Sequence, residues 1–327
     1  MAAEHARVGV DSEFAPLRTM VVARCEFRAP DEADSLGGAM PVPEDAAQVL
    51  EAVWGKTFGE VYPDKQRAWE AEREQLAAVL HSHGVEVLRP RLFDDSEKAT
   101  AGRIGYANFF VRDPWFTVGA HVIEGALQFP HRRMEVLPSR DLLVERVMPA
   151  AAAYVSLPRP GAPPLGRRGP GPFLEGGDVL VLGTDIFVGI SGMATDELGY
   201  QWLAKYLRPF GFTVTAVRLP AHVLHLDCAI GLVRDGLLIA CPERLPDGLP
   251  EPLRSWEHID VSEDEAAAMA TNGLPIDPGT YITDPEFERV GAELERRGIT
   301  VEYLDFSVSR LFGGAFRCST QPLLRED

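Results

Sequence analysis

The order of apolar and polar positions repeats one pattern three times along the chain. In each copy, apolar residues recur at helical spacing, a glycine follows, and a short apolar strand completes the segment. The three segments are residues 68–90, 194–220 and 284–305, and their glycines are Gly84, Gly211 and Gly298. Such self-similarity indicates an internally repeated architecture, although the copies are unevenly spaced.

Pairs of short strands occupy the gaps between these segments. They are predicted at residues 115–125, 178–190 and 229–241, each with a short turn that carries Gly or Asp, as is typical of β-hairpins. Hairpins that alternate with helix–strand segments favour an α/β fold with mixed sheets over a doubly wound parallel sheet. Neither GxGxxG nor GxxxxGKS/T occurs, so no nucleotide-binding fingerprint is present.

Two irregular stretches interrupt the pattern, at residues 31–47 and 156–173. The second is rich in Pro, Gly and Arg, so it is predicted to be an exposed loop. It is either a surface insertion, which we favour slightly, or a flap over an active site.

The composition argues against some classes of function but does not identify one. The chain has 327 residues with a net charge of -17, which argues against a nucleic-acid partner because phosphate binding needs a basic surface. No apolar run is long enough to cross a membrane and the N-terminus lacks a signal sequence, so a cytoplasmic location is expected. The negative charge would suit a cationic substrate, although it more often serves solubility.

Four cysteines are present, and one differs from the others. No CxxC pair occurs, so a zinc ribbon or a thioredoxin-type motif is not indicated. Cys25, Cys228 and Cys241 lie in apolar segments and are interpreted as small buried residues. Cys318 follows Gly313 and Gly314 and has polar and charged neighbours, which makes it the candidate reactive thiol.

Three further segments place ionisable residues beside apolar strands. In FFVRDPWFTVG, Asp113 is predicted at the tip of a strand, and the alternative is an ordinary turn cap. In FLEGGDVLVLG, Glu175 and Asp178 flank two glycines that permit close approach, so they form either a simple turn or a rim that binds a cation.

The third segment is HVLHLDCAIGLV. On an extended strand His225 and Asp227 would point to one face, where a buried His–Asp pair needs either a use or a partner. The alternative is a hydrogen-bonded core histidine. His222 would fall on the opposite face and is the weaker candidate.

A cysteine with a histidine and carboxylates supplies a thiolate nucleophile, a proton shuttle and an orienting acid. The acids exceed what a cysteine protease needs. A surplus of carboxylates suits a planar cation, because a carboxylate pairs with a guanidinium through two hydrogen bonds. Such a cation would also lower the pKa of the nearby thiol.

The ordered motifs RD, EGGD, HLD and RC resemble those of the guanidine-modifying superfamily of amidinotransferases, arginine and agmatine deiminases and dimethylarginine dimethylaminohydrolases. The resemblance spans nearly the whole chain, from SEFAPLRTMVVAR to GGAFRCST, and looks strongest for amidinotransferases. It implies a single catalytic domain over residues 1–327. The implied fold is a five-bladed α/β propeller (pentein) of pseudo-repeated units around a central active site, which would explain the repeated pattern.

The resemblance also implies roles for individual residues. Cys318 would attack the guanidinium carbon, His225 would move the proton and Glu175 would orient His225. Asp113 and Asp227 would grip the guanidinium nitrogens. Two further residues are assigned to substrate binding: Asp178, from the cation-rim interpretation, and Arg244, which matches an arginine that binds the α-carboxylate in the transferases. No metal or cofactor is implied.

The expected reaction is transfer of an amidino group from arginine to an amine acceptor. The alternative is a deiminase or related hydrolase that releases citrulline or a ureide, because EGGD and the tail RCSTQPLLRED look more like deiminases. Transferases usually have His where this chain has Arg317. A non-catalytic guanidino-binding member is disfavoured because Cys318 and His225 are both present. The sequence leaves the acceptor open, and also whether the chain forms a homo-oligomer.

Overall fold

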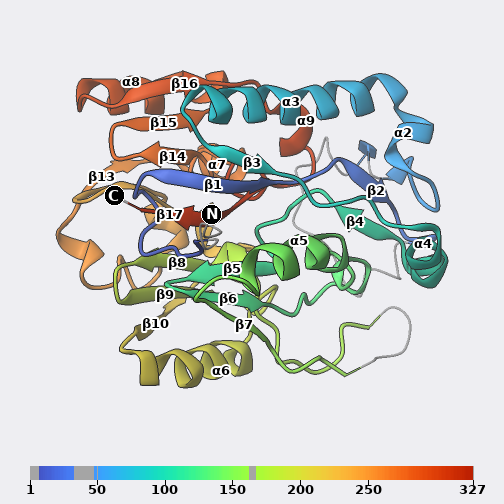
Figure 1. Cartoon of the computed structure of the whole chain (residues 1–327). Coiled ribbons are helices and arrows are strands. Elements are labelled where there is room, and N and C mark those ends of the chain that lie inside the picture. The colour runs from blue at the N-terminus through green and yellow to red at the C-terminus, as the bar shows by residue number, and fades with distance from the viewer. Residues whose placement is uncertain (1–6, 33–47, 50, 162–166, 327) are drawn as a thin grey trace, which may run out of the picture.

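The computed structural model describes residues 7–32, 48–49, 51–161 and 167–326. Residues 33–47 of the first irregular stretch and residues 162–166 of the second lie outside the described residues. Helices and mixed sheets alternate along the chain, which confirms the predicted α/β class (Figure 1). None of the helices in the described ranges is long and apolar enough to cross a membrane.

Five three-stranded sheets within the described ranges share one pattern. In each, two neighbouring strands pair antiparallel and the third lies parallel to the middle strand. The strands, sheet by sheet, are β5 (Trp115–Val118), β6 (His121–Glu124) and β7 (Ala153–Ser156); β8 (Val179–Leu182), β9 (Asp185–Ile190) and β10 (Thr213–Arg218); β11 (Ile230–Arg234), β12 (Leu237–Ala240) and β13 (Glu257–Asp260); β14 (Leu274–Asp277), β15 (Thr280–Thr283) and β16 (Thr300–Tyr303); β17 (Thr320–Arg325), β1 (Leu17–Val22) and β3 (Glu86–Leu88). A two-stranded sheet pairs β2 (Glu26–Arg28) with β4 (Tyr106–Asn108). None of these sheets closes on itself.

The predicted helix–glycine–strand segments are confirmed. Helices α3 (Pro63–Ser82), α6 (Glu197–Leu207) and α8 (Glu288–Arg296) precede β3, β10 and β16. Their glycines, Gly84, Gly211 and Gly298, have φ of +76°, +88° and +78°, which a residue with a side chain rarely adopts. The remaining α-helices of the described chain are α2 (Phe58–Val61), α4 (Asp95–Ala101), α5 (Leu137–Val147), α7 (Glu263–Ala267) and α9 (Ser307–Arg310).

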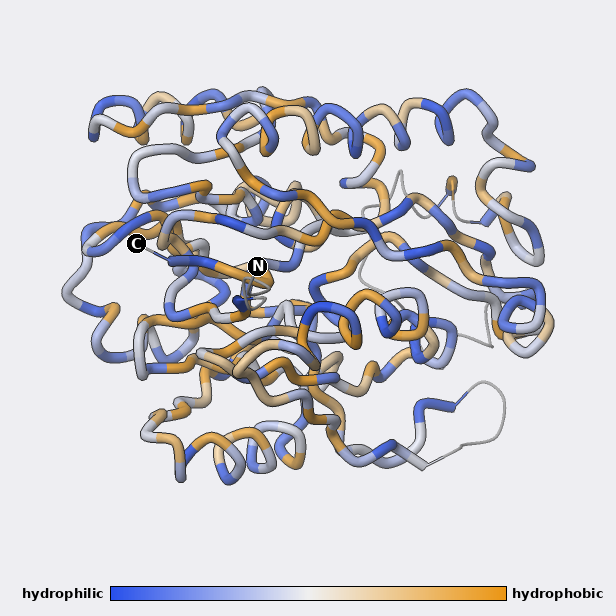
Figure 2. The backbone as a smooth tube through the Cα atoms, in the orientation of Figure 1, coloured by the Kyte–Doolittle hydropathy of each residue, from blue (hydrophilic) through white to orange (hydrophobic). Residues whose placement is uncertain are grey.

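The strand nearest the C-terminus pairs with the strand nearest the N-terminus. β17 runs antiparallel to β1, and the two lie side by side near the middle of the molecule (Figure 1). This pairing places the turn that carries Cys318, just before β17, in the interior. Figure 2 shows hydrophobic residues concentrated on the central strands, whereas α3 and α8 alternate between hydrophilic and hydrophobic residues.

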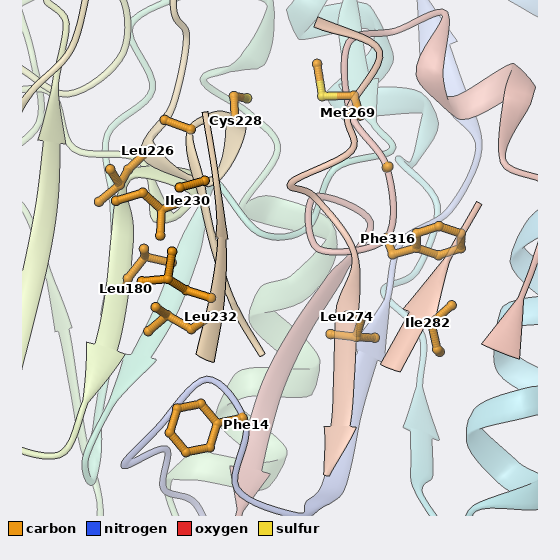
Figure 3. Close-up of a cluster of buried hydrophobic side chains, with 14 of the residues drawn as sticks. Phe14, Leu180, Leu226, Cys228, Ile230, Leu232, Met269, Leu274, Ile282 and Phe316 are labelled. Atoms are coloured by element: carbon orange, nitrogen blue, oxygen red, sulfur yellow. The ribbon is translucent and has the colours of Figure 1, made fainter. Parts of the chain in front are cut away.

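One apolar cluster joins several of the sheets. Leu180 of β8, Leu232 of β11, Leu274 of β14 and Phe316, just before β17, are all buried in it (Figure 3). Burial of side chains of this size contributes about 1.5–3 kcal/mol each. The cluster therefore fixes the relative positions of the segments that carry the candidate site residues.

Two local predictions are wrong. Asp113 does not end a strand: residues 111–114 form a turn between β4 and β5, and Pro114 has no N–H for a ladder hydrogen bond. His225 and Asp227 do not share a strand either. His225 is extended, but Asp227 lies in the 3₁₀ turn η6 (Leu226–Cys228). The turn forms because the Cys228 N–H donates to the His225 carbonyl oxygen.

Candidate active site

The candidate residues occupy equivalent places in the repeated sheets. β5, β8, β11, β14 and β17 are the strands that pair antiparallel with the middle strand of each sheet, and a turn or loop precedes each of them. These five connections hold Asp113, Glu175 with Asp178, His225 with Asp227, Asn272, and Cys318. All of these side chains are at most 2% exposed. Polar groups buried to this extent are generally hydrogen-bonded within the protein.

His225 and Glu175 form a direct pair. Nε2 of His225 lies 2.9 Å from Oε2 of Glu175, and the other oxygen of Glu175 accepts the Gln128 main-chain N–H at 2.9 Å. Nδ1 of His225 lies 3.8 Å from Oδ1 of Asp113. Burial opposes a charge on His225, but Asp113 and Glu175 outweigh it and raise the pKa of His225 to about 10. The histidine is therefore a protonated acid at neutral pH.

Arg132 holds the acids around this histidine. Its guanidinium donates to Asp113 at 2.8 Å, forms two hydrogen bonds with Glu135, and lies 3.6 Å from Glu175. Burial favours the neutral form of Asp113, yet His225 and Arg132 together hold the pKa of Asp113 below its usual value. Asp113 is therefore an anion that can accept further hydrogen bonds.

Asp113, Glu175 and His225 bring their ligand atoms within 4.8 Å of one another, a spacing that could hold a metal ion. Arg132 already supplies positive charge to the same two carboxylates. The donor set thus fits a proton-transfer pair balanced by an arginine better than a metal site.

Cys318 lies against Asp227. Its Sγ is 3.8 Å from Oδ2 of Asp227, and the same oxygen accepts from Nη1 of Arg317 at 2.9 Å. Arg317 also donates to both oxygens of Glu13, at 3.2 and 3.0 Å. Arg317 therefore fixes the carboxylate of Asp227 beside the thiol of Cys318.

The thiol of Cys318 is protonated in the free protein. Burial, followed by the charges of Asp227 and Asp113, raises its pKa well above the usual value. Gly313 adopts a φ of +75°, and a Cβ on Gly314 would lie 2.5 Å from the Phe110 ring and 2.9 Å from Cβ of Cys318. The two glycines therefore let the chain fold tightly enough to bring Cys318 inside.

The glycines beside Glu175 serve the same purpose. A Cβ on Gly177 would lie 2.7 Å from the ring of His225 and 2.8 Å from Oδ1 of Asp113, which is a clash. Asp178 is fully buried and accepts the main-chain N–H groups of Thr195 and Leu226. Asp178 thus ties the Glu175 turn to the His225 turn.

Arg244 lies in the wall of a cavity of about 780 Å³. Its Nε and Nη2 donate to the carboxylate of Glu263 at 2.9 and 2.6 Å, and Nη1 donates to the Cys228 carbonyl at 2.8 Å. One N–H on each terminal nitrogen is left by these three bonds. Leu224 and Cys228 also line the cavity and flank the turn that carries His225 and Asp227, so the cavity adjoins the buried acids.

No protein-family model matches the chain. Inosamine-phosphate amidinotransferase 1 of Streptomyces griseus is 29% identical over 349 residues, and the alignment covers 97% of each chain. The solved structure of the Streptomyces griseus amidinotransferase matches this fold with a TM-score of 0.81 at 28% identity, covering 98% of each chain. The chain is a homologue of the guanidine-modifying enzymes.

Hydrolases of this superfamily match less of the chain or match it less strongly. The N(G),N(G)-dimethylarginine dimethylaminohydrolase of Streptomyces coelicolor is 38% identical, but over 105 residues, which cover 30% of this chain and 40% of that protein. The arginine deiminase of Lactococcus lactis subsp. lactis is 27% identical over 305 residues, covering 78% of this chain and 71% of that protein. Of these three relatives, the amidinotransferase is the one whose alignment covers nearly all of both chains.

Four buried residues organise the site without having been assigned a role in it from the sequence: Glu13, Arg132, Asn272 and Arg317. Arg317 was noted as a departure from transferases, but not as the partner of Asp227 and Glu13. The one signal in the sequence is position, because Arg132 lies near Asp113 and Arg317 precedes Cys318. Glu13 lies within the SEFAPLRTMVVAR motif without having been singled out there, and Asn272 lies outside the quoted motifs.

Proposed function

We propose that the protein transfers an amidino group from arginine to an amine acceptor through a covalent intermediate on Cys318. One observation carries this proposal: a buried thiol faces the Asp227 carboxylate in a cluster that also holds Asp113 and the His225–Glu175 pair. Two carboxylates beside a thiol and a protonated histidine are the groups needed to bind and cleave a guanidinium. The full-length similarity to an amidinotransferase supports transfer.

Substrate binding would use the remaining acceptor positions of Asp113 and Asp227. Each carboxylate has about four lone-pair sites, and their arginine partners occupy only some of these. A guanidinium between them would add positive charge next to the thiol. Arg244 would bind the α-carboxylate of arginine through its two remaining N–H groups, and Asp178 would position the turns of Glu175 and His225.

In the first half-reaction, the guanidinium charge offsets Asp113 and Asp227 and so favours loss of the Cys318 proton to solvent. The thiolate attacks the guanidinium carbon, forming the C–S bond. His225 gives its proton to the departing nitrogen as the C–N bond breaks, and ornithine leaves. The amidino group remains on sulfur, and His225 is left neutral beside Glu175.

In the second half-reaction, neutral His225 takes a proton from the acceptor amine. The amine nitrogen attacks the amidino carbon, the C–S bond breaks, and the electron pair returns to Cys318 as thiolate. A new guanidino compound leaves, and His225 is protonated again. Asp113 and Asp227 would hold the amidinium nitrogens throughout, so that both transition states form in the same place.

The test is to incubate the protein with arginine, with and without amines, and to measure ornithine, citrulline and ammonia. Because inosamine-phosphate amidinotransferases from two Streptomyces species are matched over 97% and 82% of their length, an aminocyclitol phosphate belongs among the amines. Ornithine that increases with an amine supports transfer. Citrulline and ammonia released from arginine without any amine would contradict it.

Hydrolysis by the same cysteine is the second candidate, favoured by the local 38% identity to a dimethylarginine dimethylaminohydrolase. In that case water replaces the amine in the second half-reaction. Intact-mass measurement after treatment with arginine distinguishes the two, because a transferase without acceptor accumulates the amidino adduct on Cys318 and a hydrolase clears it.

For the architecture, we propose that the five three-stranded sheets are the blades of an α/β propeller. Their shared pairing pattern and the convergence of the preceding turns support this arrangement. Residues 1–327 would then form a single catalytic domain, with the site at its centre.

A further inference from the structure

We propose that Asn272 is a positioning residue for Cys318, fixing the nucleophile through two main-chain hydrogen bonds. The inference rests on the proposed function only in naming Cys318 as the nucleophile. Asn272 lies in the loop before β14, the fourth of the five equivalent connections, where the other four contribute the reactive acids, the histidine and the thiol.

The acceptor groups of Asn272 both bind the Cys318 turn. Oδ1 of Asn272 accepts the N–H of Ala315 at 3.1 Å and the N–H of Cys318 itself at 3.1 Å. The main-chain carbonyl of Asn272 accepts the N–H of Arg317 at 3.1 Å. One residue thus satisfies three of the N–H groups in the five-residue segment from Ala315 to Ser319.

Arg112 binds the carbonyl groups of the same turn. Its main-chain N–H donates to the Cys318 carbonyl at 3.2 Å, and its Nε donates to the Arg317 carbonyl at 3.1 Å. Both main-chain groups of Cys318 are therefore held, one by Asn272 and the other by Arg112. A nucleophile held in this way keeps its sulfur in place as the site fills and empties.

The side chain is specific to this task. Nδ2 of Asn272 is buried and has no hydrogen-bond partner among the described residues, so the amide is not retained for a balanced polar network. Serine is shorter and would not reach both N–H groups. Aspartate would accept both, but it would add a negative charge beside a thiol that already faces Asp227. A neutral acceptor of this length is what the turn requires.

The first experiment compares Asn272→Ala with Asn108→Ala. Asn108 is a matched control because it is also buried and its Nδ2 makes two hydrogen bonds, to Glu26 and to the Arg91 carbonyl, on strand β4. We expect Asn272→Ala to lower kcat about 100-fold with KM changed less than about threefold. Asn108→Ala should keep kcat within about threefold. Equal kcat losses in the two variants, or no loss in Asn272→Ala, would overturn the proposal.

The second experiment needs neither turnover nor the alanine variant. Asn272→Asp keeps the acceptor atoms, so the turn should stay in place while a carboxylate is brought beside the sulfur. The rate of Cys318 alkylation by iodoacetamide, followed by peptide mass spectrometry, should then reach half-maximum at a higher pH than in the wild type. An unchanged midpoint would show that the Asn272 side chain is not next to the nucleophile.

These two measurements separate this inference from the proposed function. If no guanidino compound is turned over but the alkylation midpoint shifts, the function is wrong and the positioning role stands. If arginine is consumed and both Asn272 variants behave as the wild type, the function stands and the positioning role is wrong.

Discussion

Replacing Glu175 with Gln tests the electrostatic origin of the charged histidine. Glutamine has the shape of glutamate, but a single amide oxygen cannot accept from both His225 and the Gln128 N–H, which Glu175 does at 2.9 Å each. The variant removes the negative charge that faces His225 and keeps the volume of the side chain.

The expected change in the pKa of His225 follows from the strength of its hydrogen bond with Glu175. A hydrogen bond to a charged group contributes about 1.5–3 kcal/mol, and one pKa unit corresponds to about 1.4 kcal/mol. The pKa of His225, raised to about 10 in the wild type, should therefore fall by roughly one to two units in Glu175→Gln. Asp113 remains and keeps the value above that of a free histidine.

The pH dependence has a definite sign. Because the folded-state pKa of His225 lies above the unfolded value of 6.5, its contribution to stability is complete below that pH and is lost as the pH rises toward 10. Glu175→Gln should therefore be less stable than the wild type at pH 7, by about 1.5–3 kcal/mol. It should also lose less stability than the wild type between pH 7 and pH 10.

Urea unfolding of both proteins at pH 7 and pH 10 measures this difference. Glu124→Gln is the control, because Glu124 is also buried but pairs with Arg140 and Tyr154, away from the histidine. The control should be destabilised without the altered loss between the two pH values. If Glu175→Gln and the wild type lose the same free energy from pH 7 to pH 10, Glu175 does not hold the proton on His225.

Three further predictions concern the nucleophile, the glycine turn and the cavity. Cys318→Ser should abolish both turnover and the amidino adduct while the circular dichroism spectrum is unchanged; residual adduct in intact-mass spectra would place the nucleophile elsewhere. Gly177→Ala should destabilise the protein by about 1–3 kcal/mol in urea unfolding and lower kcat, because the new methyl group would lie 2.7 Å from the His225 ring and 2.8 Å from Asp113. Arg244→Lys should raise KM for arginine at least tenfold with a smaller change in kcat, because a lysine cannot form the two-bond contact. The same variant should leave turnover of a guanidine that lacks the α-carboxylate unchanged; equal losses for both substrates in steady-state kinetics would remove the assigned role of Arg244.

Local pattern was enough to predict much of the fold. Apolar spacing and the glycines Gly84, Gly211 and Gly298 placed α3, α6 and α8 and the strands after them, because a helix end in the left-handed region is a local property. The fourth hairpin, β14 with β15, and helix α5 with strand β7 were not predicted. α5 reaches β7 without a glycine stop.

The sequence also identified the reactive residues, although not all of their local conformations. Cys318, His225, Glu175, Asp113 and Asp227 were singled out from their residue types and neighbours. In the structure His225 lies 2.9 Å from Glu175 and 3.8 Å from Asp113, and Cys318 lies 3.8 Å from Asp227. The local conformations assigned to them were partly wrong. The turns before β5 and β11 depend on hydrogen bonds to other segments, such as the Gly177 N–H to Asp113 and the Leu226 N–H to Asp178, and strand periodicity does not report these.

The sequence by itself therefore determined which parts the protein has. These are the α/β units, the glycines that permit close approach, one cysteine in polar surroundings, and more carboxylates than a cysteine protease needs. Tertiary structure alone decided which charges face one another. Arg317 meets Glu13 across 304 residues of sequence, and Asn272 holds the main chain of Cys318 across 46. Such contacts have no local periodicity, because they arise only when buried charges and main-chain groups must find partners after the sheets have packed.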